Sequence, residues 1–186
     1  MTARSLSLSL LAALIAFPVG ATGVEADWHF IGQGGGAVHA EADWAISRFF
    51  AIGGAGWFPV ATGGAPNMLD AQALFTIPVD SLLGMGLVVA PWAGYRGTLN
   101  GGSFSQGPGF GLRLDVRNRD FPLSFKAEAG AYPFMSSGAP NWFDYEGALR
   151  YSILDDVFVQ AGFRGHVASG GGPNLMGPFV SLRYGT

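Results

Sequence analysis

The sequence predicts an all-β protein that forms a closed, antiparallel, up-and-down transmembrane β-barrel of about ten strands, with eight strands as the alternative. Three observations support this prediction. Polar and apolar residues alternate along most of the chain, short turns alternate with glycine-rich loops, and charged residues keep to one face of each expected strand. Together they indicate a sheet whose two faces meet different environments.

The composition of the 186-residue chain excludes several classes of protein. Hydrophobic residues make up 49% of the chain and charged residues only 12%, which is too apolar for an intrinsically disordered protein. The chain contains no cysteine, which excludes a disulfide framework and a thiolate metal site. The net charge of −3 includes only 10 basic residues, so we expect no nucleic-acid partner.

The amino-terminal residues 1–23 are typical of a secretory signal peptide. Arg4 supplies the positive charge, Ser5–Phe17 forms the apolar region, and small residues follow up to Gly23. The apolar run is shorter than the roughly 18 to 20 residues that cross a bilayer as a helix, so an uncleaved anchor is the less favoured alternative. Residues 24–186 are then expected to form one barrel domain.

Alternation is clearest near the start of the mature chain, where Trp28 and Phe30 alternate with Asp27 and His29. The same rule predicts ten strands. Residues 68–75 fit a helical turn as well as a strand, which is why eight strands remain an alternative. The ten expected strands are 24–33, 37–47, 49–59, 69–79, 84–97, 108–117, 121–133, 142–153, 157–167 and 176–184.

The connections suggest an internal repeat. Gly94-Tyr-Arg-Gly97 returns as Gly162-Phe-Arg-Gly165, and Gly111-Leu-Arg-Leu114 returns as Ser181-Leu-Arg-Tyr184 at a similar spacing. This pattern indicates a unit of four strands used about two and a half times. Convergent turn chemistry is the alternative explanation, because Gly, Pro and Asn serve any hairpin loop.

The charged residues indicate which face of the sheet is expected to face the lumen and which is expected to face lipid. Sixteen of them fall within expected strands, and within each strand they share one parity, which leaves the other face free of charge. In a membrane barrel, a Lys or Arg turned towards lipid costs roughly 2–4 kcal/mol at the bilayer midplane, whereas a soluble sheet has no such penalty. We therefore expect Trp28, Leu112 and Phe163 to face lipid and the charges to face the lumen.

These features resemble the small outer-membrane β-barrels of Gram-negative bacteria, the porin-like and OmpA-type barrels. The resemblance covers the whole mature chain and includes a final strand, residues 177–184, that is similar to the family's insertion signal. It ends Tyr184-Gly185-Thr186, where an aromatic residue is usually last. The resemblance implies location in the bacterial cell outer membrane, with membrane lipids and the barrel-insertion machinery as partners; it leaves the oligomeric state open.

A barrel of eight to ten strands encloses little more than its own side chains. The sequence thus favours an integral outer-membrane protein with a charged, largely filled lumen and an envelope-structural or narrow-channel role. Arg183, on the last strand, should lie beside the acidic first strand after closure. The expected ion-pair network is Glu25, Asp27, Glu41, Asp43, Arg96, Arg113, Asp115, Glu128, Glu146, Arg150, Arg164 and Arg183.

One hairpin concentrates carboxylates. Glu25-x-Asp27-x-His29 is mirrored by His39-x-Glu41-x-Asp43, and a turn centred on Gly34 would pair residue 29 with 39, 27 with 41 and 25 with 43. Opposed carboxylates repel, so arginines from the facing wall are expected to offset them. A shifted register and a divalent cation are the alternatives. The candidate metal ligands are His29, His39, Asp27 and Glu41, and the candidate arginines are Arg96, Arg113 and Arg164.

Two further hypotheses compete with a structural or channel role. The first is an outer-membrane lipid-modifying enzyme, because His166-Val-Ala-Ser169 is loosely similar to the His-x-Ser segment of lipid A deacylases. The spacing is one residue too long, and no acid follows His166 to orient its ring, so we assign no catalysis and expect no cofactor. The second is a soluble exported β-sandwich that binds a ligand.

Overall fold

The computed structural model describes residues 22–32, 35–60, 64–82, 85–118, 121–134, 139–172 and 174–185. The predicted signal peptide therefore lies outside the described residues, apart from Thr22 and Gly23. The strands are β1 (Gly23–Ile31), β2 (Gly35–Ser47), β3 (Phe50–Val60), β4 (Asn67–Phe75), β5 (Ile77–Leu82), β6 (Met85–Asn100), β7 (Ser103–Asn118), β8 (Leu123–Tyr132), β9 (Trp142–Leu154), β10 (Val157–Ala168) and β11 (Asn174–Gly185). In the part of the chain described, no helix is long and apolar enough to cross a bilayer.

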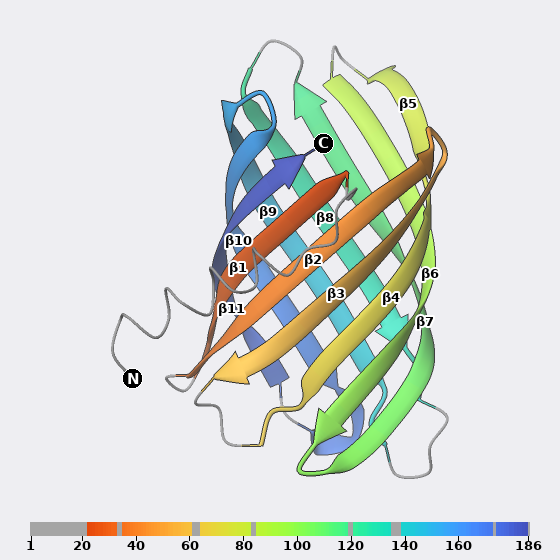
Figure 1. Ribbon diagram of the computed structural model, residues 1–186, viewed down its shortest axis with the longest axis vertical. Helices are drawn as coiled ribbons and strands as arrows, with labels where there is room; N and C mark the ends of the chain where they lie inside the picture. The colour runs from red at the N-terminus through yellow and green to blue at the C-terminus, as the bar shows by residue number, and fades with distance from the viewer. Residues whose placement is uncertain are drawn as a thin grey trace.

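The sheet closes into a barrel (Figure 1), because β1 pairs with β11 as well as with β2, and every pairing is antiparallel. The segments β4 and β5 both pair with β6 and are separated only at Thr76, so together they form one strand of a ten-stranded wall. The predicted closed up-and-down barrel of ten strands is confirmed. The eight-stranded alternative, the helical turn at residues 68–75 and the β-sandwich are wrong, because Met68 and its neighbours pair continuously with β3 and β6.

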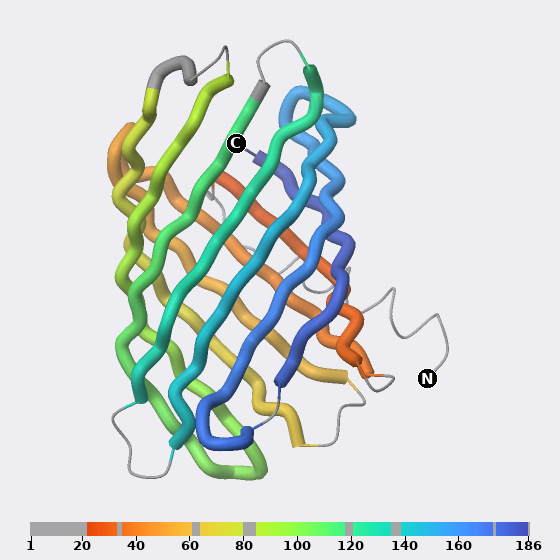
Figure 2. The backbone as a smooth tube through the Cα atoms, turned by 180° about the vertical axis from the view of Figure 1, so that it is seen from behind, coloured from red at the N-terminus to blue at the C-terminus, as the bar shows by residue number. Residues whose placement is uncertain are grey.

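The two rims of the barrel differ. Gly23 pairs with Gly185, so β1 begins and β11 ends at one rim, which we call the short-turn rim because it also carries the turns at residues 48–49 and 155–156. The opposite rim, which we call the long-loop rim, carries the connections between β3 and β4 and between β8 and β9. Figure 2 shows the same arrangement from behind.

The hairpin of β6 and β7 is longer than the sequence predicts. The long loop expected between residues 97 and 108 is replaced by paired strand up to Asn100↔Ser103. The turn residues Gly101 and Gly102 have φ angles of 54° and 89°, the left-handed values that a two-residue hairpin turn requires at both positions. The polar residues after Gly102 resemble a loop in sequence, but in the structure they extend the ladder at the long-loop rim.

The faces of the strands follow the predicted parity. All sixteen strand charges lie in described residues, and Arg117, near the short-turn rim, is the one that is exposed. On the outer wall, Leu112 is 42% exposed and Phe163 is 45% exposed. Trp28 is half-buried because its indole covers the bare backbone of Gly36. The barrel is therefore apolar outside and charged inside.

An apolar cluster fills part of the interior, and most of its residues come from the strand ends near the long-loop rim. Glycines make room for its largest rings: a Cβ atom at Gly111 would lie only 2.5 Å from Cε2 of Trp92. The cluster comprises Ile31, Ala37, Trp57, Met68, Leu74, Trp92, Tyr132, Trp142, Ala168 and Leu175.

Candidate functional site

The lumen is organised by four arginines that each contact two carboxylates, so that eight different acidic residues are paired. The ninth strand carboxylate, Asp115, lies 2.7 Å from Nη1 of Arg150. Each of the nine acidic side chains that the sequence predicts to lie in strands thus has a cationic partner. The eight contacts, at 2.5 to 3.4 Å, are Arg96 with Asp70 and Asp144, Arg113 with Glu41 and Glu128, Arg164 with Asp27 and Glu146, and Arg183 with Glu25 and Asp43.

The four bridging arginines are the arginines of the repeated segments. Arg96 and Arg164 occupy equivalent places in the two copies, and each guanidinium also lies over an aromatic ring. The distance from Arg96 Cζ to the centre of the Tyr132 ring is 3.8 Å, and from Arg164 Cζ to the centre of the Phe179 ring it is 4.4 Å. Desolvated cation–π contacts of this kind hold a guanidinium in a fixed orientation. The repeated segments therefore supply the four arginines that bridge the carboxylates of the lumen, in addition to their turns.

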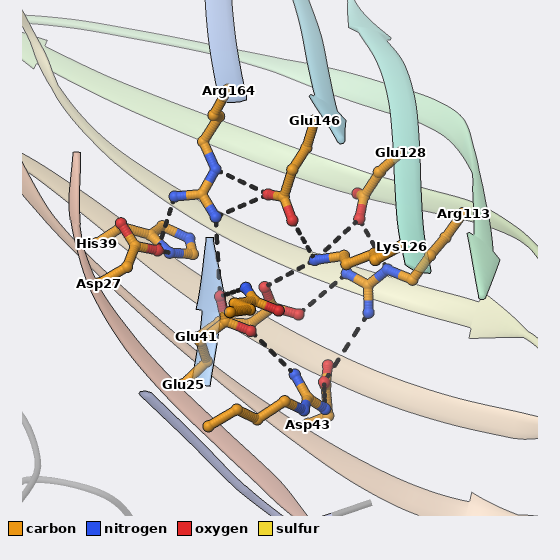
Figure 3. A network of polar contacts seen from close by, with 12 residues as sticks. Glu25, Asp27, His39, Glu41, Asp43, Arg113, Lys126, Glu128, Glu146 and Arg164 are labelled. Carbon is orange, nitrogen blue, oxygen red and sulfur yellow. Dashed lines mark hydrogen bonds and ion pairs between the residues drawn. The ribbon is translucent and has the colours of Figure 1, made fainter. Parts of the chain in front are cut away.

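Lys126 joins the arginine groups at the centre of the lumen (Figure 3). It is 1% exposed, and its Nζ lies 3.0 Å from Glu146 Oε1, 3.7 Å from Glu128 Oε2 and 3.9 Å from Glu41 Oε2. An ammonium group has three donors, which suits a position among three carboxylates. Because the ammonium group is almost completely shielded from water, these carboxylates must compensate its charge.

The acidic hairpin of β1 and β2 has a register that differs by two residues from the expected one. Glu25 pairs with Glu41, Asp27 with His39, and His29 with Ala37. The shifted register was one of the alternatives, and it places an imidazole opposite a carboxylate: His39 Nδ1 lies 2.6 Å from Asp27 Oδ2. The attraction between this pair replaces one of the expected carboxylate repulsions.

Glu25 and Glu41 do face each other across β1 and β2, and cations separate their charges. Glu25 accepts hydrogen bonds from Gln160 Nε2 and from Arg183, which pairs directly with it across β1 and β11. Glu41 accepts a hydrogen bond of 3.0 Å from Arg113 Nη2. Arg113 and Arg164 thus reach this hairpin as expected of the facing wall, whereas Arg96 binds Asp70 and Asp144 instead.

The four candidate metal ligands are not brought together. Of the described residues, the group close enough to hold an ion is Glu25, Asp27 and His39, with ligand atoms within 4.8 Å of one another. Its carboxylates are already used, because Asp27 Oδ2 lies 2.8 Å from Arg164 Nη1. The candidate His29 lies elsewhere: its Nδ1 accepts a hydrogen bond from Trp57 Nε1 and its Nε2 faces the carbonyl oxygen of Gly177 at 3.2 Å. Two of the arginines that were expected to offset these carboxylates therefore do contact this hairpin.

The candidate catalytic pair His166 and Ser169 is also separate. His166 is 6% exposed inside the lumen, and its Nδ1 lies 3.0 Å from Oδ1 of Asp144, which is its cross-strand partner on β9. An acid therefore does accompany this histidine, though it comes from the neighbouring strand. Ser169 Oγ instead accepts a hydrogen bond of 2.9 Å from the backbone N–H of Asn141. Among the described residues, no hydroxyl group is hydrogen-bonded to His166, so the arrangement lacks an activated nucleophile.

Within the described part of the chain, two of the hollows inside the barrel share no lining residue. The larger contains about 660 Å³ of space, some of it open solvent, and lies among the arginine groups and β3. The smaller, of about 200 Å³, is lined at the short-turn rim by Arg117, Ser124, Arg150, Phe158, Arg183 and Gly185. Glu25 and Gln160 line neither hollow, and Arg150 Nε donates a 2.8 Å hydrogen bond to Gln160 Oε1. Glu25 and Gln160, which are hydrogen-bonded to each other, therefore fill a part of the lumen that lies outside both hollows.

Four residues of the network are absent from the set proposed from sequence. Asp70, Asp144 and Lys126 share the parity of the other inward charges, so that signal was sufficient to include them. Gln160 is uncharged and gave no such signal, although it is 1% exposed and links Glu25 to Arg150. Its role is visible only once β1 and β11 close the barrel.

Comparison with models of known protein families finds no match, and neither a search of curated protein sequences nor a search of solved structures finds one. The functional argument therefore rests on the geometry of the outer wall and the lumen.

Proposed function

We propose that this protein is an integral β-barrel of the bacterial outer membrane, with a lumen filled by ion pairs and an envelope-structural role. The observation that carries the proposal is the sidedness of the wall. Large apolar side chains such as Phe110, which is 61% exposed, cover the outside, while Glu25, Lys126 and Arg96 are at most 2% exposed within. Water would favour the opposite arrangement, whereas lipid favours this one.

The closed sheet supports the same conclusion. Within a bilayer every backbone N–H and C=O group must be paired, and a barrel closed by β1 and β11 leaves no open edge across most of its height. An even number of strands brings Gly23 and Gly185 to one rim. In the proposed orientation this short-turn rim faces the periplasm and the long-loop rim faces outwards. Insertion by the barrel-assembly machinery would then begin from β11.

A narrow channel is the second candidate, and the two hollows favour it. A wide diffusion pore is not supported, because the bridging side chains lie within the lumen and the two hollows share no lining residue. In the proposed state the side-chain bonds through Gln160 keep the path closed. Any conductance would then require those bonds to rearrange.

Fractionation tests the membrane location, and electrophysiology separately tests whether the lumen is closed. The full-length protein should co-fractionate with outer membranes and migrate differently on gels before and after heating, as closed barrels do. A freely soluble periplasmic pool would contradict the membrane assignment. In planar bilayers the closed lumen should give no steady conductance; well-defined single-channel steps would instead favour the channel role.

A further inference from the structure

The larger hollow has an excess of negative charge. Counting histidines as neutral, six carboxylates and four cationic side chains line it, so the lining has two more negative than positive charges; Arg183, which lies outside the lining, binds one of the six, Asp43. Uncompensated charge in a poorly hydrated interior is costly, so a positive occupant is favoured there. The carboxylates are Glu41, Asp43, Asp70, Glu128, Asp144 and Glu146, and the cationic residues are Arg96, Arg113, Lys126 and Arg164.

The free surface of the hollow consists of carboxylates more than of cations. All of these side chains point inwards, so their remaining exposure is to the lumen. Four of the six carboxylates keep 11 to 17% of their side-chain surface, whereas the four cationic side chains keep 1 to 9% because they are covered by the groups that they bind. The four exposed carboxylates are Asp43, Asp70, Glu128 and Asp144. An occupant therefore meets carboxylate oxygens first.

A buried imidazole adds an unused acceptor to the same hollow. His166 lines it and keeps 7% of its side-chain surface. Its Nδ1 lies 3.0 Å from Oδ1 of Asp144, a position that favours the tautomer with the ring proton on Nδ1 and a lone pair on Nε2. Neither ring nitrogen has a hydrogen-bond partner among the described residues, and Nε2 has no carboxylate beside it as Nδ1 has. A group that carries an N–H donor would satisfy it, whereas a bare alkali-metal ion would not donate a hydrogen bond.

Aromatic rings complete the lining. Trp57 packs edge-on against His166 with ring centres 5.3 Å apart, and Tyr132 lies under Arg96; both rings line the hollow. The face of an indole or phenol ring attracts ammonium groups. Two buried donors, Trp92 Nε1 and Arg96 Nη1, also lack hydrogen-bond partners among the described residues.

We propose that the larger hollow binds a small ammonium-type cation, such as ammonium or a primary amine, through its exposed carboxylates and Nε2 of His166. The excess negative charge selects a cation, and the histidine acceptor selects one that carries N–H groups. The inference depends only on the lumen and holds whether or not the barrel conducts ions. It goes beyond the envelope role, and its test is separate from the fractionation and conductance measurements.

Thermal unfolding of the full-length barrel in detergent micelles provides the test, with ammonium chloride, methylammonium chloride and tetramethylammonium chloride compared at equal ionic strength. The three cations have the same charge, but the last has no N–H donor. Ligand at a hundred times its dissociation constant should raise the unfolding midpoint by about 5 to 10 °C for a chain of this size. We expect the rise with the first two salts and not with tetramethylammonium.

Matched charge variants locate the effect. Glu128→Gln removes one exposed carboxylate of the hollow, and we expect the apparent affinity for methylammonium to fall by at least about fivefold. Asp155→Asn removes the same charge from an exposed turn at the short-turn rim and should leave the affinity unchanged. Asp70→Asn is the second hollow variant if Glu128→Gln does not give a heat-modifiable barrel.

The outcomes are distinct. An equal rise with tetramethylammonium, or no rise with any of the three salts in the folded wild-type barrel, overturns the proposal. So does an equal loss of affinity in Asp155→Asn and in the hollow variant. A rise limited to the N–H-bearing cations and weakened only by the hollow variant supports it.

Discussion

Removal of the central lysine should destabilise the barrel strongly, because one side chain serves three carboxylates. In Lys126→Met the aliphatic stem is retained and the charge is lost. Nζ lies 3.0, 3.7 and 3.9 Å from carboxylate oxygens of Glu146, Glu128 and Glu41 and is almost fully enclosed. The change leaves those three acids to share Arg113 and Arg164 alone.

The size of the effect follows from burial. Removing one partner of a buried ion pair costs roughly 3–5 kcal/mol, because the remaining charge is left desolvated. Arg113 and Arg164 still contact the three carboxylates that lose Lys126. We therefore expect the free energy of unfolding to fall by an amount near the lower limit, about 3 kcal/mol. Arg48→Met is the matched control: Arg48 is exposed in a turn, lies over Phe49 at 4.3 Å, and should contribute less than about 1 kcal/mol.

Urea titration of the barrel folded in phospholipid vesicles, followed by tryptophan fluorescence, measures these losses in the free energy of unfolding. Lys126→Met/Glu146→Gln should be less destabilised than the sum of its single variants by about 1 kcal/mol or more, because the double change removes both members of a contact. If Lys126→Met costs no more than Arg48→Met, the lumen is well hydrated and the reasoning from burial is refuted.

Three further predictions follow from the wall, the packing and the histidine. Leu112→Arg, in the middle of the outer face of β7, should lower the free energy of unfolding in membranes by roughly 2–4 kcal/mol, and equal stability of Leu112→Arg and Leu112→Phe would contradict a lipid-facing wall. Gly111→Ala should cost about 1–3 kcal/mol in the same titration because its Cβ would press on Trp92, whereas Gly147→Ala, with nothing within 4 Å of the added Cβ, should change stability little. His166→Ala should leave lipid A acylation and phospholipid content of the outer membrane unchanged by mass spectrometry; altered acyl chains would revive the enzyme hypothesis.

The alternation of the sequence determined the sidedness of this barrel. Side chains of a strand alternate between two faces whatever the register, so Leu112 and Arg113 must lie on opposite sides of β7. Parity alone therefore assigns the charges to one surface, and the cost that a charge would have in lipid predicts that this surface is the inner one. The same rule placed Lys126, Asp70 and Asp144 inside before any contact was known.

Local signals were weaker where the chain departs from regular alternation. The sequence predicts a single strand over residues 69–79, whereas the structure divides it at Thr76 into β4 and β5, which both pair with β6. The extension of β6 and β7 to Gly101 and Gly102 was missed because glycine and serine are equally common in loops and in hairpin turns. In both places cross-strand pairing, a non-local property, determined the strand boundaries.

Only the tertiary structure decided which charges meet. Arg96 bonds to Asp144, 48 residues away, and Gln160 bonds to Glu25, 135 residues away, because closure of the sheet brings those strands around one lumen. The register of β1 against β2 likewise depends on the fit of Asp27 to His39 and not on parity, since a shift of two residues keeps every side chain on its face. Periodicity along the chain specifies which face of the sheet each side chain occupies. Which side chains meet across the lumen depends on the curvature and stagger of the barrel and on the pairing of buried opposite charges.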